Sequence, residues 1–190
     1  DNGGKTGQAT ELPSLGLGTA QAGTTGATLV TDRAANIPAY FAGHWVEVRD
    51  ATGVTLKGTW RISTDASGIV SKTVTLVPNS AETIDIQSGD KWQGVYRFDQ
   101  LSVLNGANLT SADPVRTASS IVLDGSIVDT LSVTGSIEIR NAVIARRIDA
   151  QTLTVRSGAS LSHLSSGTAA ESLLLNVTGA LTVEFGGAID

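Results

Sequence analysis

Apolar residues alternate with polar residues in short runs along most of the chain, a pattern that predicts β-strands. In the second half one phrase returns: an apolar residue, a spacer, Val, and then Gly followed by Ala or Ser. Four copies begin at Leu101, Leu131, Leu153 and Leu175, and a weaker copy begins at Ile121. The last two steps are 22 residues long. A repeat of this length with alternating apolar positions predicts a solenoid of stacked coils.

Residues 99–190 are therefore expected to form a parallel β-helix of about four or five coils, with about 20 residues in each coil. Inward Leu, Ile and Val side chains would stack into ladders and contribute roughly 2 kcal/mol each. The stretch Ser136–Ala150 carries some helical spacing, but we favour two strands around Asn141. The strand pattern continues through Leu181 to the last residues, so we expect the coils to continue beyond residue 190.

The first half predicts antiparallel strands. His44–Arg49 alternates, Asp50–Gly53 supplies a turn, and Val54–Ile62 alternates again, which predicts a β-hairpin. A sheet of about five short strands must pack or close to cover its inner face, so a small β-sandwich or barrel is expected. The further strands are expected over residues 72–77, 83–87 and 92–98.

The aromatic residues mark a boundary near residue 98. Seven of the eight aromatics lie between Tyr40 and Phe98, whereas positions 99–184 contain none. This change indicates one core with aromatic packing and another filled by Leu, Ile and Val. The chain is thus expected to be all-β. Its expected parts are a flexible Gly- and Thr-rich arm or linker over residues 1–26, a β-sandwich or barrel over 27–98, and β-helix coils over 99–190.

Charge and composition exclude several partners. The net charge of −5 argues against nucleic acid, which is bound through clustered Lys and Arg. The chain contains neither Cys nor Met, so disulfides, thiolate metal sites and cysteine catalysis are excluded. A membrane-spanning helix needs about 20 consecutive apolar residues, and no run in the sequence approaches that length. We therefore expect no membrane span.

The sequence gives little support for metal binding or for nucleophilic catalysis. His44 and His163 have no further ligand at zinc-site spacing, so no metal is expected. Neither common calcium-binding motif occurs, and structural calcium is only a minor alternative to the absence of any cofactor. The chain also lacks a Gly-x-Ser-x-Gly elbow. We expect a protein without catalytic residues.

A charged stretch in the second half offers an alternative function. β-Helical polysaccharide lyases and glycosidases carry acidic and basic side chains on the outer faces of adjacent coils, and two carboxyl groups about 5 to 9 Å apart can perform acid and base work on a glycosidic bond. Against this, residues 99–184 contain no aromatic residues that would stack on sugars. The candidate binding residues are Glu138, Arg140, Arg146, Arg147 and Asp149.

The tryptophans of the first half form a second candidate binding surface. Trp45, Trp60 and Trp92 would stack on sugars if they were exposed in one plane. Most tryptophans of this kind belong to the core instead. Trp45 and Trp60 are the candidates for a carbohydrate site.

Residues Gly89–Phe98, followed by Leu101–Gly106 and the returning Leu-Thr-Val and Gly-Ala-Leu phrases, resemble repeat regions of very large bacterial exoproteins of the adhesin type. The resemblance covers about residues 89–190. It implies an extracellular or cell-surface protein with a right-handed β-helical stalk. The chain departs from filamentous adhesins because it has no long Asn ladders.

Two functions follow as hypotheses. The first is a non-catalytic stalk, spacer or wall of a large bacterial surface or secreted protein. Its partners would be neighbouring modules of the same polypeptide, with cell-surface glycans or another protein as further candidates. The alternative is a carbohydrate-binding or polysaccharide-degrading β-helix. Clustered exposed carboxylates or an exposed tryptophan plane would favour the alternative.

Overall fold

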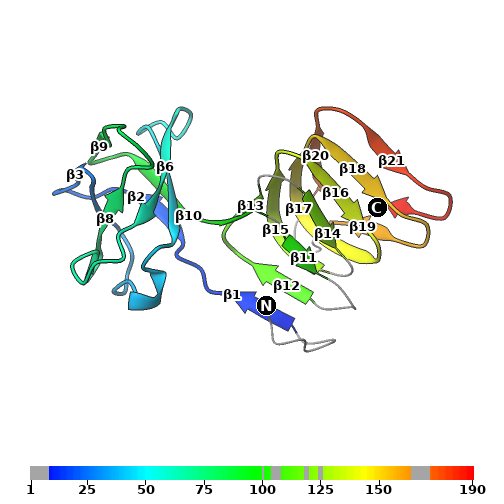
Figure 1. The fold of residues 1–190 in the computed structure, drawn as a ribbon, viewed down its shortest axis with the longest axis horizontal. Coiled ribbons are helices and arrows are strands. Elements are labelled where there is room, and N and C mark those ends of the chain that lie inside the picture. Colours follow the sequence, from blue (N-terminus) through cyan, green and yellow to red (C-terminus); the bar gives the residue numbers. More distant parts are fainter. Residues whose placement is uncertain (1–8, 100, 104–107, 118–119, 124–125, 164–171) are drawn as a thin grey trace. The chain divides into compact units, whose positions relative to one another are not determined.

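The computed structural model of the chain is all-β and divides into two compact units (Figure 1). Unit 1 comprises Asp1–Ser14 together with Arg97–Asp190, and unit 2 comprises Leu15–Tyr96. The described residues contain no α-helix and one short 3-10 helix, η1. The structure describes residues 9–99, 101–103, 108–117, 120–123, 126–163 and 172–190.

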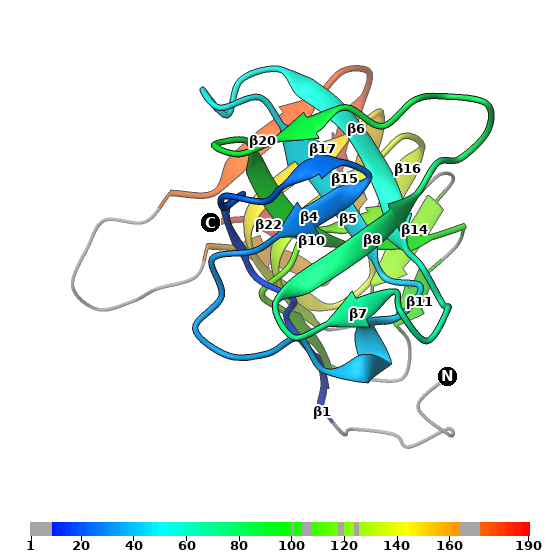
Figure 2. The ribbon, with the colours of Figure 1, turned by 90° about the vertical axis from the view of Figure 1, so that its left-hand side faces the viewer.

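Unit 2 is built from antiparallel strands (Figure 2). Strand pairing runs in the order β2, β10, β5, β6, β8, β4, β3 and β9, and β7 pairs with β8. Its elements are β2 (Leu17–Thr19), β3 (Thr25–Gly26), β4 (Thr28–Val30), η1 (Ala39–Phe41), β5 (Trp45–Arg49), β6 (Leu56–Ile62), β7 (Ile69–Val70), β8 (Thr73–Val77), β9 (Ile86–Gln87) and β10 (Lys91–Phe98).

The hairpin predicted in the first half is confirmed. β5 and β6 pair antiparallel, with Trp45 opposite Arg61, and the register shifts between Val48 and Arg49. Gly53 ends the connecting turn with φ of 75°, a conformation that favours glycine. The carboxylate of Asp50 accepts hydrogen bonds from Thr52 Oγ1 and from two backbone N–H groups that follow. Turn chemistry that is visible in the sequence therefore sets this register.

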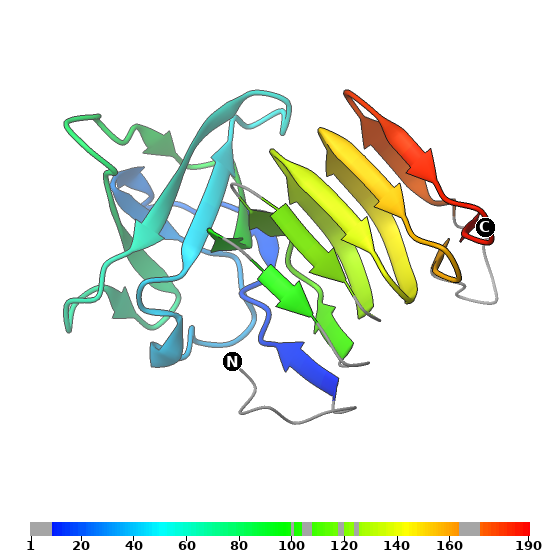
Figure 3. The ribbon, with the colours of Figure 1, turned by 45° about the vertical axis from the view of Figure 1, so that its right-hand side comes forward.

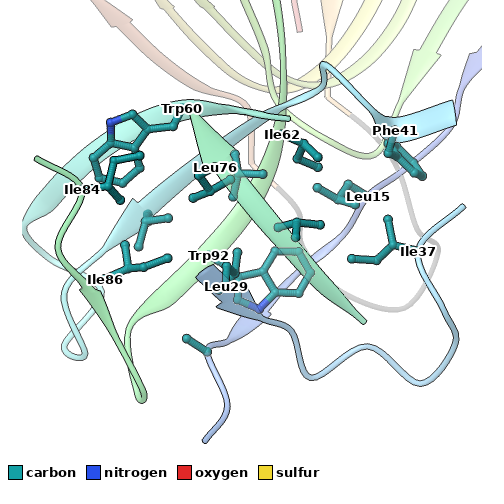
Figure 4. Close-up of a cluster of buried hydrophobic side chains, with 14 residues drawn as sticks. Leu15, Leu29, Ile37, Phe41, Trp60, Ile62, Leu76, Ile84, Ile86 and Trp92 are labelled. Carbon is teal, nitrogen blue, oxygen red and sulfur yellow. The ribbon is translucent and has the colours of Figure 1, made fainter. Parts of the chain in front are cut away.

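The core of unit 2 combines aliphatic and aromatic side chains (Figure 4). Val46 and Val48 point into it from β5, as the alternation of that strand predicts. Trp60 lies beside Ile84, and Trp92 lies beside Leu29 (Figure 4). Because these large side chains come from strands that are distant in sequence, their burial holds the antiparallel strands together.

Unit 1 is built from parallel strands (Figure 3). Its strands are β1 (Ala9–Leu12), β11 (Leu101–Val103), β12 (Asn108–Ser111), β13 (Val115–Thr117), β14 (Ser120–Leu123), β15 (Ser126–Val133), β16 (Ser136–Ile139), β17 (Ala142–Ala150), β18 (Thr152–Val155), β19 (Ser160–Ser162), β20 (Leu174–Val177), β21 (Leu181–Val183) and β22 (Ala188–Ile189).

The strands of unit 1 form two sets of parallel pairs that alternate along the chain. Sheet I contains β11, β14, β16, β18 and β21 in that order. Sheet II contains β1, β12, β13, β15, β17, β19, β20 and β22. Inward positions of both sets carry fully buried aliphatic side chains, among them Ile137, Ile139, Ile148 and Leu153. Parallel strands of this kind need a buried apolar face to be stable.

The stacking interval of sheet I varies along the chain. Leu101, Ile121, Ile137, Leu153 and Leu181 lie opposite one another in succession, with steps of 20, 16, 16 and 28 residues. The 28-residue step contains the longer connection between β19 and β20. The mean step is 20 residues, as expected, but the individual steps vary because the connections between strands differ in length.

The returning Leu-x-Val phrase occurs in both sets of strands. The copies at Leu101 and Leu153 lie in sheet I. The copy at Leu131 lies opposite Ile148, which in turn lies opposite Leu175, and these three residues belong to sheet II. The spacing of the phrase therefore does not measure one coil. It marks any short strand with two inward apolar residues, whichever sheet the strand joins.

The two strands expected around Asn141 are confirmed as β16 and β17. β17 is long, and its first part pairs with β19 while its last part pairs with β20. Arg146 and Arg147 are both exposed between these parts, which interrupts the alternation. A one-residue break of this kind turns the following side chains to the other face, so that Ile148 is buried.

The structure places strands in the predicted linker. Within residues 1–26 it forms β1, β2 and β3, with β1 in unit 1 and the other two in unit 2. β1 pairs parallel with β12, with Thr10 opposite Leu109. This pairing is invisible to local sequence analysis because the two strands are almost a hundred residues apart. The boundaries of the two units also differ from the expected boundaries at residues 26 and 98. Unit 2 begins at Leu15 and ends at Tyr96, and unit 1 is discontinuous in sequence.

Candidate functional site

A chain of ion pairs follows the ends of the last strands in sheet I. We call Glu138, Arg140, Arg156 and Glu184 the charge ladder. Arg140 Nε and Arg156 Nε both donate to Glu138 Oε1, at 2.7 and 3.0 Å. Arg156 Nη1 also donates to Glu184 Oε1, at 2.5 Å. Arg156 therefore bridges two carboxylates that come from different strands.

Strand register brings the members of the charge ladder together. Ile139, Val155 and Val183 end β16, β18 and β21 and lie opposite one another in succession. The residues that follow these strand ends are Arg140, Arg156 and Glu184. They therefore lie beside one another at the same end of the strands of sheet I. Neighbouring strands lie about 4.8 Å apart, a distance that charged side chains bridge easily.

The ladder stabilises the charged form of each of its acids. Hydrogen bonds from Arg156 and then Arg140 lower the pKa of Glu138 below its ordinary value. A hydrogen bond from Arg156 and one from the Ser157 backbone lower the pKa of Glu184. The two glutamates in turn raise the pKa of Arg156. Glu138, Glu184 and Arg156 are thus charged at neutral pH and hydrogen-bond to one another.

A second ion pair lies on sheet II. Arg147 donates to both carboxylate oxygens of Asp149, at 2.8 and 3.0 Å, and Asn176 Nδ2 donates to Oδ1 at 3.3 Å. Burial by itself would raise the pKa of Asp149, but the hydrogen bond and charge of Arg147 lower it overall, with help from Asn176 and Arg116. Asp149 also raises the pKa of Arg147.

The five charged candidates from the sequence do not form one surface cluster. Glu138 belongs to β16 in sheet I and Arg140 follows that strand, whereas the other three candidates belong to β17 in sheet II. The chain passes from one sheet to the other at Asn141. The expectation of a single charged binding face is therefore not met. Residues that are close in sequence on either side of Asn141 belong to different sheets. The candidates on β17 are Arg146, Arg147 and Asp149.

These carboxylates do not match the requirements of glycoside hydrolysis. A general acid needs a raised pKa, so that it keeps its proton at neutral pH. Glu138 and Asp149 show the opposite shift, and each is held by arginine. They are arranged as ion-pair partners within the fold.

Two members of the charge ladder were missed in the sequence. Arg156 and Glu184 lie outside the dense charged stretch, so a search for local charge density passes over them. A signal was nevertheless present: each follows a Leu-Thr-Val strand, as Arg140 follows Ile-Glu-Ile. Aligning strand ends, rather than counting charges, would have found them.

Trp45 is half-buried on β5, and one face of its ring is covered. The Arg61 guanidinium carbon lies 4.7 Å from the ring centroid, which is cation–π geometry. Arg61 is the residue opposite Trp45 in the hairpin register. The arginine occupies ring surface on which a sugar would stack.

Trp60 is a core residue. It is 3% exposed, and its indole N–H donates to Glu82 Oε1 at 2.9 Å. Glu82 also accepts from the Asn79 backbone at 2.8 Å. Trp92 is buried as well, and its N–H donates to Asp32 at 3.2 Å. The exposed tryptophan plane considered from the sequence is therefore absent from unit 2, because two of its three rings fill the core.

The histidines lie in different units. His44 packs edge-on against Tyr96, with ring centroids 4.6 Å apart, and against Phe41 at 5.2 Å. Burial lowers its pKa to about 4. His163 is exposed. Within the described part of the chain, no cluster of three or more His, Asp or Glu side chains is arranged to hold a metal ion.

No known family, curated protein or solved structure matches the chain. The described residues also include no helix that is long and apolar enough to cross a membrane. A functional assignment therefore depends on the geometry of the chain itself.

Proposed function

We propose that the protein is a non-catalytic structural and interaction module, acting as a stalk, spacer or wall in a large bacterial surface or secreted protein. In this proposal unit 1 is a right-handed parallel β-helix and unit 2 is a small β-barrel or sandwich. The observation that carries it is the succession Leu101, Ile121, Ile137, Leu153 and Leu181, in which each strand adds to the previous one in register.

Stacked strands of this kind suit a load-bearing element. Each inner strand of sheet I pairs with the strand on either side of it, so stability accumulates as strands are added. The outer charges of unit 1 support the same proposal. Glu138 and Asp149 are neutralised by arginines of the fold. Arg156 joins Glu138 to the adjacent strand, and Asn176 on β20 donates to Asp149 on β17. These contacts hold neighbouring strands together and occupy the carboxylates.

The alternative of a polysaccharide-binding or polysaccharide-degrading module has weaker support. Its charged candidates are divided between two sheets, and Trp60 is buried. Trp45 retains some exposed surface, but Arg61 covers one face of its ring. Neither arrangement resembles a platform for a sugar ring.

Glycan-array binding of the full chain, combined with a hydrolysis assay on the retained polysaccharides, tests the proposal. We expect no specific retention and no cleavage. Arg147→Gln and Trp45→Ala serve as paired variants, one for each unit. Specific binding that disappears in one of them, while its thermal unfolding stays intact, would overturn the structural role and locate a carbohydrate site.

Location is tested separately on cells that produce the protein. Protease added to intact cells should remove the chain from the surface, or the chain should accumulate in the medium. A chain that is protected in intact cells and released only by lysis contradicts a surface or secreted role. This result is independent of the binding assay.

A further inference from the structure

Among the four prolines of the chain, only Pro114 follows an aspartate. The Asp113–Pro114 bond lies in the connection between β12 and β13, and both residues are buried. In an Asp–Pro pair the side-chain carboxyl reaches the backbone carbonyl carbon of its own residue by closing a five-membered ring. Proline leaves as a secondary amine, and its nitrogen has no N–H that a neighbouring strand could hold. The sequence therefore places a nucleophile and a leaving group at one peptide bond.

The carbonyl group of this bond is polarised by a neighbouring hydroxyl group. Ser111 Oγ donates to the backbone oxygen of Asp113 at 2.6 Å, and both residues are 2% exposed. This oxygen gains negative charge when a nucleophile attacks the carbonyl carbon. A donor that already points at the oxygen stabilises that charge, and it does so more strongly where water is excluded. Ser111 thus occupies the position of an oxyanion donor.

The carboxyl group of Asp113 is held by a separate segment of unit 1. Ser14 Oγ donates to Asp113 Oδ1 at 2.5 Å. This bond restricts rotation of the Asp113 side chain, so that fewer conformations carry the carboxyl away from the backbone carbonyl. Ser14 contacts the carboxyl group but not the bond that breaks. It is therefore a positioning residue.

We propose that the Asp113–Pro114 bond is a self-cleavage site. An oxygen of the Asp113 carboxyl group attacks the backbone carbonyl carbon of the same residue, the new C–O bond closes a cyclic anhydride, and the C–N bond to Pro114 breaks. The carboxyl proton passes to the proline nitrogen, which leaves as a secondary amine. Water then opens the anhydride, so Asp113 ends one fragment with two carboxyl groups and Pro114 begins the other. The step occurs once in each chain, acts on no external substrate, and is independent of the proposed structural role.

Strand pairing would hold the two fragments together after cleavage. β12 and β13 both pair in parallel with β15, with Ser111 opposite Val128 and Val115 opposite Leu131 (Figure 1). Residues 1–113, which include all of unit 2, would therefore stay bound to residues 114–190 until unit 1 unfolds. The site offers a way to separate unit 2 from the later strands without an added protease.

Incubation of the purified full chain, folded and unfolded in urea in otherwise identical buffers, gives the first test. Urea removes the contacts of Ser111 and Ser14 but keeps the Asp–Pro sequence. We expect the folded chain to yield fragments 1–113 and 114–190 about a hundred-fold faster, the effect that one preorganised oxyanion donor supplies. Mass spectrometry identifies the two fragments. Cleavage that is equally fast in urea, or slower in the folded chain, would overturn the proposal.

Variants separate the roles of the residues. Asp113→Ala should abolish cleavage, and Ser111→Ala should slow it about a hundred-fold, whereas Ser111→Thr keeps the hydroxyl donor and should still cleave. Ser14→Ala should slow cleavage in chains that remain folded, and Ser14→Thr should restore it. Ser102→Ala, on an exposed side chain of β11, is the matched control and should cleave at the native rate. Thermal unfolding shows which variants are folded, and a folded Ser111→Ala chain that cleaves at the native rate contradicts the proposal.

Hydroxylamine distinguishes this route from digestion by a contaminating protease. It captures an anhydride as a hydroxamate, so part of fragment 1–113 should end in a hydroxamate of Asp113, while Pro114 begins the other fragment unmodified. The cleavage rate should also be independent of chain concentration and of protease inhibitors, because the step occurs within one molecule. Absence of the hydroxamate, or a rate that inhibitors reduce, would show that the bond is not cut by its own carboxyl group.

Discussion

Ser14 Oγ donates a hydrogen bond to Asp113 Oδ1 at 2.5 Å, although 99 residues separate the two in sequence. Both residues belong to unit 1, and all of unit 2 lies between them in the chain. Asp113 is 2% exposed, and its backbone carbonyl accepts a further bond from Ser111 Oγ at 2.6 Å. The Ser14 bond therefore ties the segment before unit 2 to the segment after it, close in sequence to the pairing of β1 with β12.

Ser14→Ala should destabilise unit 1. The change removes a donor from a buried carboxylate, and we expect the free energy of unfolding to fall by about 1 to 3 kcal/mol. Hydrogen exchange in β12 measures this effect. Tryptophan fluorescence would not, because all three tryptophans lie in unit 2 and report the unfolding of that unit. Ser102→Ala, on an exposed side chain of β11, is the matched control. Equal effects of the two changes would contradict the role of the bond.

Leu153→Ala and Leu181→Ala compare two positions in the same register. Leu153 is fully buried, and its replacement should lower the free energy of unfolding by about 2 to 5 kcal/mol. Leu181 is half exposed, so we expect the same replacement there to cost less than half as much. Urea unfolding followed by circular dichroism measures both. Similar losses at the two positions would show that Leu181 is covered in solution.

Arg156→Gln should raise the pKa of both Glu138 and Glu184 toward ordinary values, because their hydrogen bonds to the guanidinium are lost. A lowered carboxyl pKa stabilises the fold above the ordinary pKa, and this contribution disappears as the pH falls through the folded-state pKa. The variant should therefore lose less stability on acidification than the native chain. NMR titration of the side-chain carboxyls measures the pKa values. Arg147→Gln is the control, since it should raise the pKa of Asp149 and leave Glu138 unchanged.

His44 should make the stability of unit 2 depend on pH. Burial lowers its pKa from 6.5 to about 4, so between these values the unfolded chain binds a proton that the folded chain does not. Stability from this source is complete above pH 6.5, falls as the pH decreases toward 4, and changes no further below that. His44→Phe, which keeps an aromatic ring beside Tyr96, should flatten the slope over this interval. Tryptophan fluorescence during urea unfolding at a series of pH values measures the slope. If His163→Gln removes the slope and His44→Phe does not, the prediction for His44 is wrong.

The antiparallel unit was largely predictable because its signals are local. Asp50–Gly53 combines turn residues with flanking alternation, and the hairpin forms as expected. Burial of Val46 and Val48 follows from the same alternation. Glu47 is also buried, which alternation does not predict, and Arg49 pairs with it at 2.9 Å. A neighbouring cation thus allows a carboxylate to lie within a covered part of the sheet.

The charged site was only partly predictable. Local charge density identified Glu138 and Asp149, which both form ion pairs, but it grouped them on one face. It also passed over Arg156, the residue that joins two strands of the charge ladder. Ion pairs between adjacent strands depend on register, and register is decided when strands stack.

By itself, the sequence determined that the chain is all-β, that its composition changes near residue 98, and that short Leu-x-Val strands supply the second core. These properties follow from alternation and side-chain type, which act between near neighbours. Only the tertiary structure decided that β1 joins β12, that the Leu-x-Val phrase serves both sheets, and that Arg156 connects Glu138 with Glu184. Each of these pairings joins segments that are distant in sequence. The register of such pairings is set when the strands stack and bury their inward side chains, so it depends on several segments together.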